Sequence, residues 1–194
     1  RSVPGSANAI LIIGGAGGVA SIAIQLVRAL TDLTVIATAS RPETRDWVMD
    51  LGAHHVIDHS KPLADEIKAL GIGAPGFVFS TNGTADNLDA IVELIAPQGH
   101  FGLIDDPEAL NVSAFKQKSV STHWEFMFTR SMFETADMNE QGKLLDRIAE
   151  LIDTGKIRTT LGEVMTPINA ETLKEAHRKS EAGRAKGKIV LEGF

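Results

Sequence analysis

The sequence predicts an α/β fold in which a doubly wound parallel β-sheet carries helices on both faces. Short apolar, β-branched runs alternate along the 194 residues with longer segments whose apolar residues recur at helical spacing. The first run, residues 9–13, is apolar throughout, which is typical of a central strand covered on both faces. Strands that alternate with helices of this length need crossover connections, and they therefore form a parallel sheet.

The elements follow one another in a regular order. Apolar residues from Val19 to Leu30 share one helical face directly after the first strand. Pro42 begins the next helix at a favoured first-turn position, and Gly52 ends it. Further helices are expected at 63–70 and 88–95, and a later one buries a core face that includes Leu144 and Leu145. The expected strands are 9–13, 34–38, 56–57, 77–80, 101–104 and 120–124.

Composition excludes several classes of protein. Nineteen basic and twenty-five acidic residues argue against a surface made for nucleic acid or an anionic membrane. The absence of cysteine excludes disulfides, thiol nucleophiles and Cys-ligated zinc within this chain. The uncharged run 9–24 is interrupted by glycines and is too short to span a bilayer, so we expect no membrane segment and a cytoplasmic location.

A glycine-rich run at 15–20 is the motif that indicates a binding function. Its pattern is G-x-G-x-x-A, and it lies between an apolar strand and an amphipathic helix, which is the context of a Rossmann dinucleotide-binding turn. Gly15 is expected to allow the tight turn, and Gly17 to let a pyrophosphate approach the backbone. The helix amino terminus then offers N–H groups to the phosphates. A purely structural glycine turn is the alternative interpretation.

The end of the second expected strand predicts which cofactor is bound. NAD-binding proteins usually carry an acidic residue there, which holds the ribose 2′-hydroxyl. This chain has Ser40 and Arg41 instead, and Glu43 is the first carboxylate that follows. A hydroxyl and a guanidinium suit the 2′-phosphate of NADP, and Arg45 could add a second charge. We therefore predict NADP(H), the alternative being a solvated loop.

Several runs resemble one known superfamily. The segments Ile10–Arg28, Ala37–Ser40 and Leu51–Asp58 look like the coenzyme domain of medium-chain dehydrogenases/reductases. Residues 96–100 and 186–191 are similar to further motifs of that superfamily, in the same order. The resemblance covers nearly the whole chain and is strongest to the quinone oxidoreductase-like branch, which is also catalogued as zinc-type alcohol dehydrogenase-like.

The resemblance implies a set of cofactor-binding residues. Residues 15–19 would line the pyrophosphate, and Ser40 and Arg41 would face the 2′-phosphate. His59, where relatives often have tyrosine, would lie near the adenine ribose, and Arg184 would reach the phosphates. Residues after the fourth and fifth strands would approach the ribose and nicotinamide. The full set is Gly15, Ala16, Gly17, Gly18, Val19, Ser40, Arg41, Arg45, His59, Ser80, Thr81, Asn82, Leu103, Ile104, Asp105 and Arg184.

The resemblance also implies a domain organisation and an activity. Residues 1–159 would form the NADP-binding Rossmann domain, and 160–194 would pack toward an N-terminal catalytic domain that this chain lacks. Because the chain starts without Met, we expect an excised and inactive fragment. The parent would be an NADPH-dependent oxidoreductase that reduces a quinone or another conjugated carbonyl. Its small-molecule substrate would bind through the missing domain, and a homodimer fits this superfamily.

Other functions stay open or are opposed by particular residues. A zinc-dependent alcohol dehydrogenase domain and a non-catalytic NADP sensor both remain, because no residue here is assigned as acid, nucleophile or metal ligand. The chain has no tyrosine, which opposes a short-chain dehydrogenase. His54, His55 and His59 invite a metal, but neighbours along a strand face opposite ways, so we predict no metal site. Trp124, Phe126 and Phe128 could stack on a nicotinamide or pack on the sheet, and Asp105 fits a turn.

Overall fold

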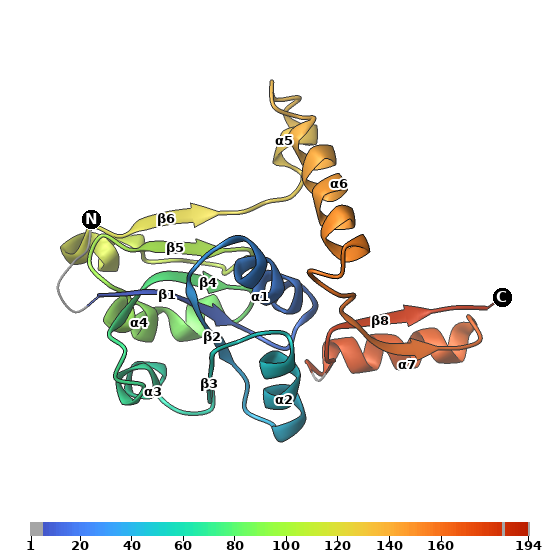
Figure 1. Ribbon diagram of the computed structural model, residues 1–194, viewed down its shortest axis with the longest axis horizontal. Helices are drawn as coiled ribbons and strands as arrows, with labels where there is room; N and C mark the ends of the chain where they lie inside the picture. Colours follow the sequence, from blue (N-terminus) through green and yellow to red (C-terminus); the bar gives the residue numbers. More distant parts are fainter. Residues whose placement is uncertain (1–5, 184, 194) are drawn as a thin grey trace.

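A six-stranded parallel sheet forms the centre of the computed structural model, which describes residues 6–183 and 185–193 (Figure 1). Its strand order is β3-β2-β1-β4-β5-β6, and every neighbouring pair is parallel. The sequence progresses in opposite directions on the two sides of the β1–β4 pair, so the ends of these strands form the switch point of a doubly wound sheet. The strands are β1 (Ser6–Ile13), β2 (Thr34–Thr38), β3 (His55–Ile57), β4 (Ala74–Ser80), β5 (His100–Leu103) and β6 (Ser121–Trp124).

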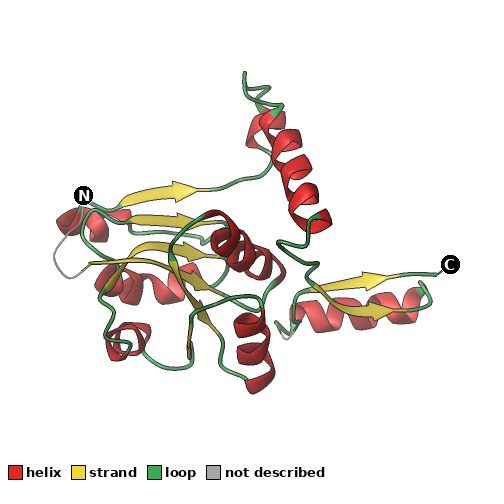
Figure 2. Cartoon of the chain, in the orientation of Figure 1, coloured by secondary structure: helices red, strands yellow, loops and turns green. Residues whose placement is uncertain are grey.

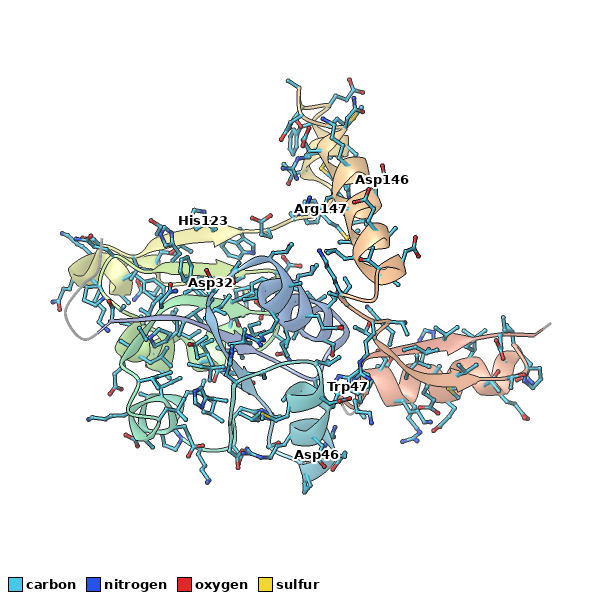
Figure 3. The ribbon with its side chains drawn as sticks, in the orientation of Figure 1. Asp32, Asp46, Trp47, His123, Asp146 and Arg147 are labelled. Atoms are coloured by element: carbon cyan, nitrogen blue, oxygen red, sulfur yellow. The ribbon has the colours of Figure 1, made fainter. Side chains whose placement is uncertain are left out.

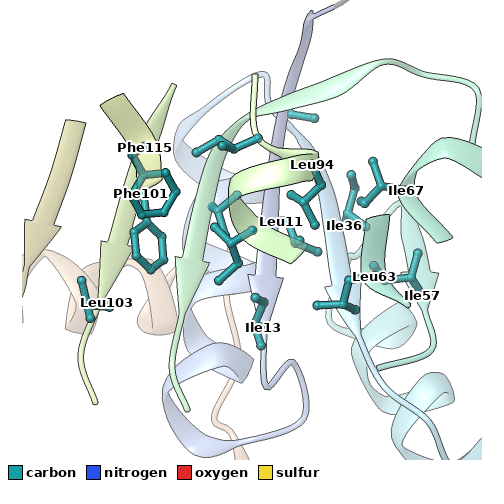
Figure 4. Close-up of a cluster of buried hydrophobic side chains, with 14 residues drawn as sticks. Leu11, Ile13, Ile36, Ile57, Leu63, Ile67, Leu94, Phe101, Leu103 and Phe115 are labelled. Carbon is teal, nitrogen blue, oxygen red and sulfur yellow. The ribbon is translucent and has the colours of Figure 1, made fainter. Parts of the chain in front are cut away.

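Helices cover both faces of this sheet, as predicted. On one face α1 (Gly18–Leu30) and α2 (Pro42–Asp50) pack on a cluster that includes Ile12 and Val35. On the other, α3 (Leu63–Ala69), α4 (Thr84–Leu94) and the 3₁₀ helix η1 (Val112–Lys118) pack on a cluster built around Leu11 and Ile13 (Figure 4). Successive β1 residues face opposite ways, so one apolar run supplies both cores.

The chain after β6 leaves the sheet. It forms α5 (Thr129–Met132) and α6 (Glu140–Asp153), and α6 extends away from the sheet (Figure 1). Leu144 and Leu145 are 57% and 59% exposed, whereas Leu151 is buried. The expected core face of this helix is therefore buried only at Leu151, half-buried at Ile148 and exposed at its other positions within this chain. We find no helix in the described residues with the length and apolar character needed to cross a membrane.

A C-terminal unit lies to one side of the main sheet (Figure 2). It consists of β7 (Leu161–Met165), α7 (Ala170–Glu181) and β8 (Lys188–Leu191), and β7 pairs with β8 in a separate two-stranded parallel sheet. Asn169 caps α7 through its side chain, which accepts hydrogen bonds from the N–H groups of Glu171 and Thr172, both at 2.9 Å. This unit meets the main domain at the glycine-rich turn, where Gly187 forms an isolated bridge with Gly17.

Candidate dinucleotide site

A cavity of about 680 Å³ lies at the carboxyl ends of β1, β2 and β4. Its walls come from the glycine-rich turn, from the residues that follow β2 and β4, and from α7 and β8 of the C-terminal unit. This is the switch-point crevice at which open α/β sheets bind their ligands. The predicted site residues that line it are Ala16, Gly17, Gly18, Val19, Ser40, Arg41, His59, Thr81 and Asn82.

The tight turn after β1 is made by Gly14. Its φ is +82°, in the left-handed region that favours glycine, and a Cβ placed there would lie 2.5 Å from the Thr81 hydroxyl. Gly15, to which the sequence assigned this turn, is buried and outside the lining of the cavity. A Cβ on Gly15 would lie 2.8 Å from the Thr38 carbonyl oxygen, so this glycine lets the turn pack against β2.

Gly17 and Gly18 form the amino terminus of α1 at the cavity wall. The first helical turn leaves backbone N–H groups without partners inside the helix, and they carry the positive end of its dipole. Gly17 has no side chain with which to cap them, and the next three residues, Gly18 to Ala20, are uncharged. The turn therefore presents donors and a partial positive charge to the cavity, which is the arrangement that binds phosphate.

A lysine from the C-terminal unit lies across this turn. The Gly187 N–H donates to the Ala16 carbonyl oxygen at 2.9 Å, which brings the following residue, Lys188, to the start of α1. A Cβ on Gly18 would lie 2.8 Å from the Lys188 ammonium nitrogen, so the charged end of this side chain lies directly over the turn. Sequence reasoning missed Lys188 and assigned the role to Arg184, which lies outside the described residues.

At the end of β2, Ser40 and His59 meet at the cavity wall. The Ser40 hydroxyl and the His59 Nε2 are 3.1 Å apart. Arg41 also lines the cavity, and its Nε forms an ion pair with Glu43 at 2.9 Å. The hydroxyl of Thr44 donates to the Arg41 carbonyl oxygen at 2.9 Å and fixes the start of α2. A hydroxyl, an imidazole and a guanidinium thus line the cavity near the ends of β2 and β3.

Arg45 does not line the cavity. Its guanidinium donates to the carbonyl oxygens of Ala39 at 3.3 Å and Val56 at 3.1 Å. These two residues lie at the carboxyl end of β2 and within β3, so Arg45 joins the ends of two neighbouring strands. The charged group of Arg45 therefore binds backbone carbonyl oxygens of the fold.

Some of the predicted site residues after β4 and β5 line the cavity, whereas others make contacts within the fold. Thr81 and Asn82 line the cavity, and the Thr81 hydroxyl donates to the Ile13 carbonyl oxygen at 2.8 Å. Asp105 instead accepts hydrogen bonds from the Thr84 hydroxyl and, at 2.9 Å, from the Thr84 N–H at the start of α4. Two predicted residues, Ser80 and Leu103, are buried, and neither they nor Ile104 and Asp105 line the cavity.

His54, the first of the three neighbouring histidines, makes contacts within the fold. His54 accepts a hydrogen bond from the Val35 N–H through Nδ1 at 2.8 Å, and its Nε2 is 2.6 Å from Arg28. Partial desolvation, and then the Arg28 charge, lower the pKa of His54 below its usual value, and the ring links β2 to α1 through Val35 and Arg28. Within the described residues no three His, Asp or Glu side chains form a group that could hold a metal ion.

The aromatic residues after β5 are exposed and lie outside the cavity lining. Trp124, Phe126 and Phe128 are each about half exposed, with values of 51%, 51% and 50%. The Trp124 indole N–H donates to the Asp105 carbonyl oxygen at 3.1 Å, and the two phenylalanines pack edge to face at 5.4 Å. Trp124 is the last residue of β6, and Phe126 and Phe128 follow the end of that strand.

A parallel sheet with a glycine-rich turn at its switch point defines an α/β domain of the dinucleotide-binding Rossmann class. The sequence profile of the zinc-binding dehydrogenases matches residues 51–191, and the chain belongs to that family. The expected membership of the medium-chain dehydrogenase/reductase superfamily, as a coenzyme-binding fragment, is confirmed.

Individual relatives agree with this family. A zinc-type alcohol dehydrogenase-like protein of Staphylococcus aureus strain MSSA476 is 36% identical over 185 residues, which is 95% of this chain and 55% of the relative. The human mitochondrial NAD(P)H oxidoreductase RTN4IP1 is 30% identical over 94% of this chain and 47% of its own length. The chain therefore spans about half the length of the curated relatives it matches.

One solved structure is particularly similar. It is the crystal structure of a protein from Rhizobium etli CFN 42 that is assigned to the zinc-dependent alcohol dehydrogenases. The two chains are 62% identical and superpose with a TM-score of 0.94, and the match covers 100% of this chain and 57% of that chain. A mycobacterial protein, Rv1454c, whose structure was solved with NADPH, has a TM-score of 0.77 at 24% identity and shares the fold.

Proposed function

We propose that this chain is the NADP(H)-binding part of an oxidoreductase that reduces a quinone or another conjugated carbonyl. One observation carries the proposal. The glycine-rich turn, the amino terminus of α1 and the ammonium group of Lys188 converge on one cavity at the switch point of the sheet. Donors and positive charge at a helix amino terminus suit a pyrophosphate. The family of dehydrogenases to which the chain belongs supplies the general reaction class.

The cavity lining offers partners for several parts of the cofactor. Lys188 and the first N–H groups of α1 would bind the pyrophosphate, and Ser40, Arg41 and His59 would surround the adenosine 2′-phosphate. When bound, the nicotinamide supplies the hydride, and the residues of this chain orient it. Thr81 and Asn82, at the end of β4, would hold the ribose and nicotinamide side.

The preference for NADP over NAD rests on the residues after β2. Ser40 and Arg41 occupy the place at which NAD-binding proteins usually carry a carboxylate. The carboxylate of Glu43 is paired with Arg41, so it does not oppose a phosphate as an isolated acid would. The name of the human relative, an NAD(P)H oxidoreductase, is in accord with either nucleotide.

The catalytic half of the reaction would come from residues outside this chain. We propose that the segment from 160 onward packs toward an N-terminal catalytic domain, which would complete the cleft for a small-molecule substrate. The quinone or conjugated carbonyl is carried over from the resemblance to the quinone oxidoreductase-like branch.

A zinc-dependent alcohol dehydrogenase is the second candidate. The family description and the 62% identical structure from Rhizobium etli favour it. The described residues of this chain do not fit a zinc site, so any metal ligands would have to come from elsewhere in the protein. Metal analysis of the protein at its full natural length, together with assays of NADPH plus quinones and of NAD⁺ plus alcohols, separates the two candidates.

Calorimetric titration of the protein with NADPH and with NADH tests the pyrophosphate site directly. Lys188→Ala should weaken both cofactors by a similar factor of about tenfold, because both carry the same pyrophosphate. Lys68→Ala, on α3 at the opposite face of the sheet, is the matched control and should bind both normally. Unchanged binding by Lys188→Ala would remove the main support for the proposed function.

A further inference from the structure

We infer that His59 makes the choice between NADP(H) and NAD(H) depend on pH, because its imidazolium form binds the 2′-phosphate together with Ser40. The inference rests on the proposed function and names the group that controls specificity in the same site. It starts from one contact, in which the His59 Nε2 lies 3.1 Å from the Ser40 hydroxyl at the wall of the cavity.

Among the described residues, the two arginines that follow β2, Arg41 and Arg45, already have partners in the fold. The Arg41 Nε is paired with Glu43 at 2.9 Å, so a phosphate must share this guanidinium with a carboxylate. Arg45 donates to two backbone carbonyl oxygens and does not line the cavity. The net positive charge available to a 2′-phosphate therefore depends strongly on whether His59 is protonated.

The Ser40–His59 pair matches the chemistry of a phosphate monoester. The hydroxyl and a protonated ring nitrogen can each donate to a different phosphate oxygen, and a hydrogen bond from a cation to a phosphate is about twice as strong as one between neutral groups. NADH carries a hydroxyl in place of this phosphate. Protonation of His59 should therefore strengthen the binding of NADPH and leave that of NADH nearly unchanged.

Two imidazoles, those of His59 and His177, line the described part of the cavity, and His59 is the one in contact with Ser40. Next to His59, hydrogen bonds from Ser60 hold the pKa of Asp58 below its usual value, so Asp58 stays ionised. The other charged groups are Lys61 and Glu66 after β3, Arg41 and Glu43 at the start of α2, and His177 and Glu181 of α7 across the cavity. An imidazole changes its charge between about pH 5 and pH 8, where carboxylates, lysines and arginines do not.

The test is the affinity of the protein for NADPH and for NADH at about pH 6 and about pH 8, at constant ionic strength. The 2′-phosphate itself takes up a proton near pH 6, which affects every variant equally. His59→Gln keeps an amide donor but cannot become charged. Relative to this variant, the wild-type protein should gain about tenfold more affinity for NADPH on acidification, while its affinity for NADH stays level.

Two further variants make the result specific. His59→Lys should bind NADPH tightly at both pH values, because its charge is permanent in this range. His55→Gln, which changes a neighbouring histidine of β3 outside the cavity lining, should behave like wild type. The same pH dependence in wild type and His59→Gln would overturn the inference, as would a parallel change for NADH. Failure of both nucleotides to bind any variant would instead overturn the proposed function itself.

Discussion

The side-chain amide of Gln25 in α1 holds both backbone groups of Arg158. Its Nε2 donates to the Arg158 carbonyl oxygen at 3.1 Å, and its Oε1 accepts from the Arg158 N–H at 2.8 Å. Trp47 of α2, labelled in Figure 3, strengthens this junction. The centre of its ring lies 5.1 Å from the Lys186 ammonium and 5.8 Å from the Arg158 guanidinium. The helices α1 and α2 thus anchor the chain just before β7, at Arg158, and just before β8, at Lys186.

Gln25→Leu is expected to lower the free energy of unfolding by about 1–3 kcal/mol, since it leaves the N–H and C=O groups of Arg158 without their partner. Urea denaturation measures the change. Gln117→Leu in the exposed part of η1 is the matched control and should change stability by no more than about 0.5 kcal/mol. Equal stability of the two variants would show that Gln25 does not hold the junction.

Gly17→Val is expected to abolish cofactor binding and to leave the fold intact. The added side chain would stand where the pyrophosphate approaches the amino terminus of α1, whereas in the protein itself a Cβ at this position meets only the Gly14 carbonyl oxygen, at 3.2 Å. Calorimetry with NADPH and far-UV circular dichroism measure the two effects. Gly142→Val on α6 is the control variant, because a Cβ at Gly142 would have no atom within 4 Å beyond its chain neighbours and the backbone of its own helix. Normal NADPH binding by Gly17→Val would mean that these glycines serve only as a turn.

Arg41 and Arg45 are expected to have separate effects when replaced. Arg41→Asp should reverse the preference for NADPH, because it places a carboxylate beside the 2′-phosphate position. Arg45→Ala should instead reduce stability by about 1–3 kcal/mol through the loss of its two bonds to strand carbonyls, with little change in the ratio of NADPH to NADH affinity. A change of cofactor preference in Arg45→Ala would contradict this division of roles.

His54 should make stability depend on pH. Its pKa in the folded protein is lowered by burial and by Arg28, so at acidic pH the unfolded chain binds a proton that the folded chain resists. The stabilising effect is complete above the usual value of 6.5 and is lost as the pH falls through that value toward the lowered one. Urea midpoints measured from about pH 7.5 to 5.5 should therefore fall more steeply for wild type than for His54→Gln. Parallel slopes would contradict the structural role of this imidazole.

Local pattern was enough to predict the main sheet. The β-branched run 34–38 was expected as a strand and is β2 with the same bounds, because central parallel strands are apolar along their whole length. The helices α1 and α2 were placed to within a residue or two by apolar spacing, Pro42 and Gly52. By contrast α7, mostly polar, was not predicted, although Asn169 with Thr172 forms a capping box before it.

Details of the site depended on contacts between distant parts of the chain. The turn residue is Gly14 because Thr81 and Asn82 pack against it, and nothing near Gly14 in the sequence shows this. Asp105 fits a local turn as well as a site, yet its carboxylate serves Thr84 of α4. Lys188 could have been suggested by the run Lys186-Gly187-Lys188, but its position over the first helix follows only from the bridge to Gly17.

The bridge between Gly17 and Gly187 also sets an order of events during biosynthesis. The glycine-rich turn leaves the ribosome early, but Gly187 and Lys188 are translated only on the order of ten to thirty seconds later, at typical elongation rates of about 5–20 residues per second. The bridge can therefore form only after all six strands of the main sheet have been translated. The stability that this bridge gives to the glycine-rich turn becomes available only when translation has passed β8, so nascent chains with destabilising substitutions in β1 or α1 should be especially prone to aggregation or proteolysis before that moment.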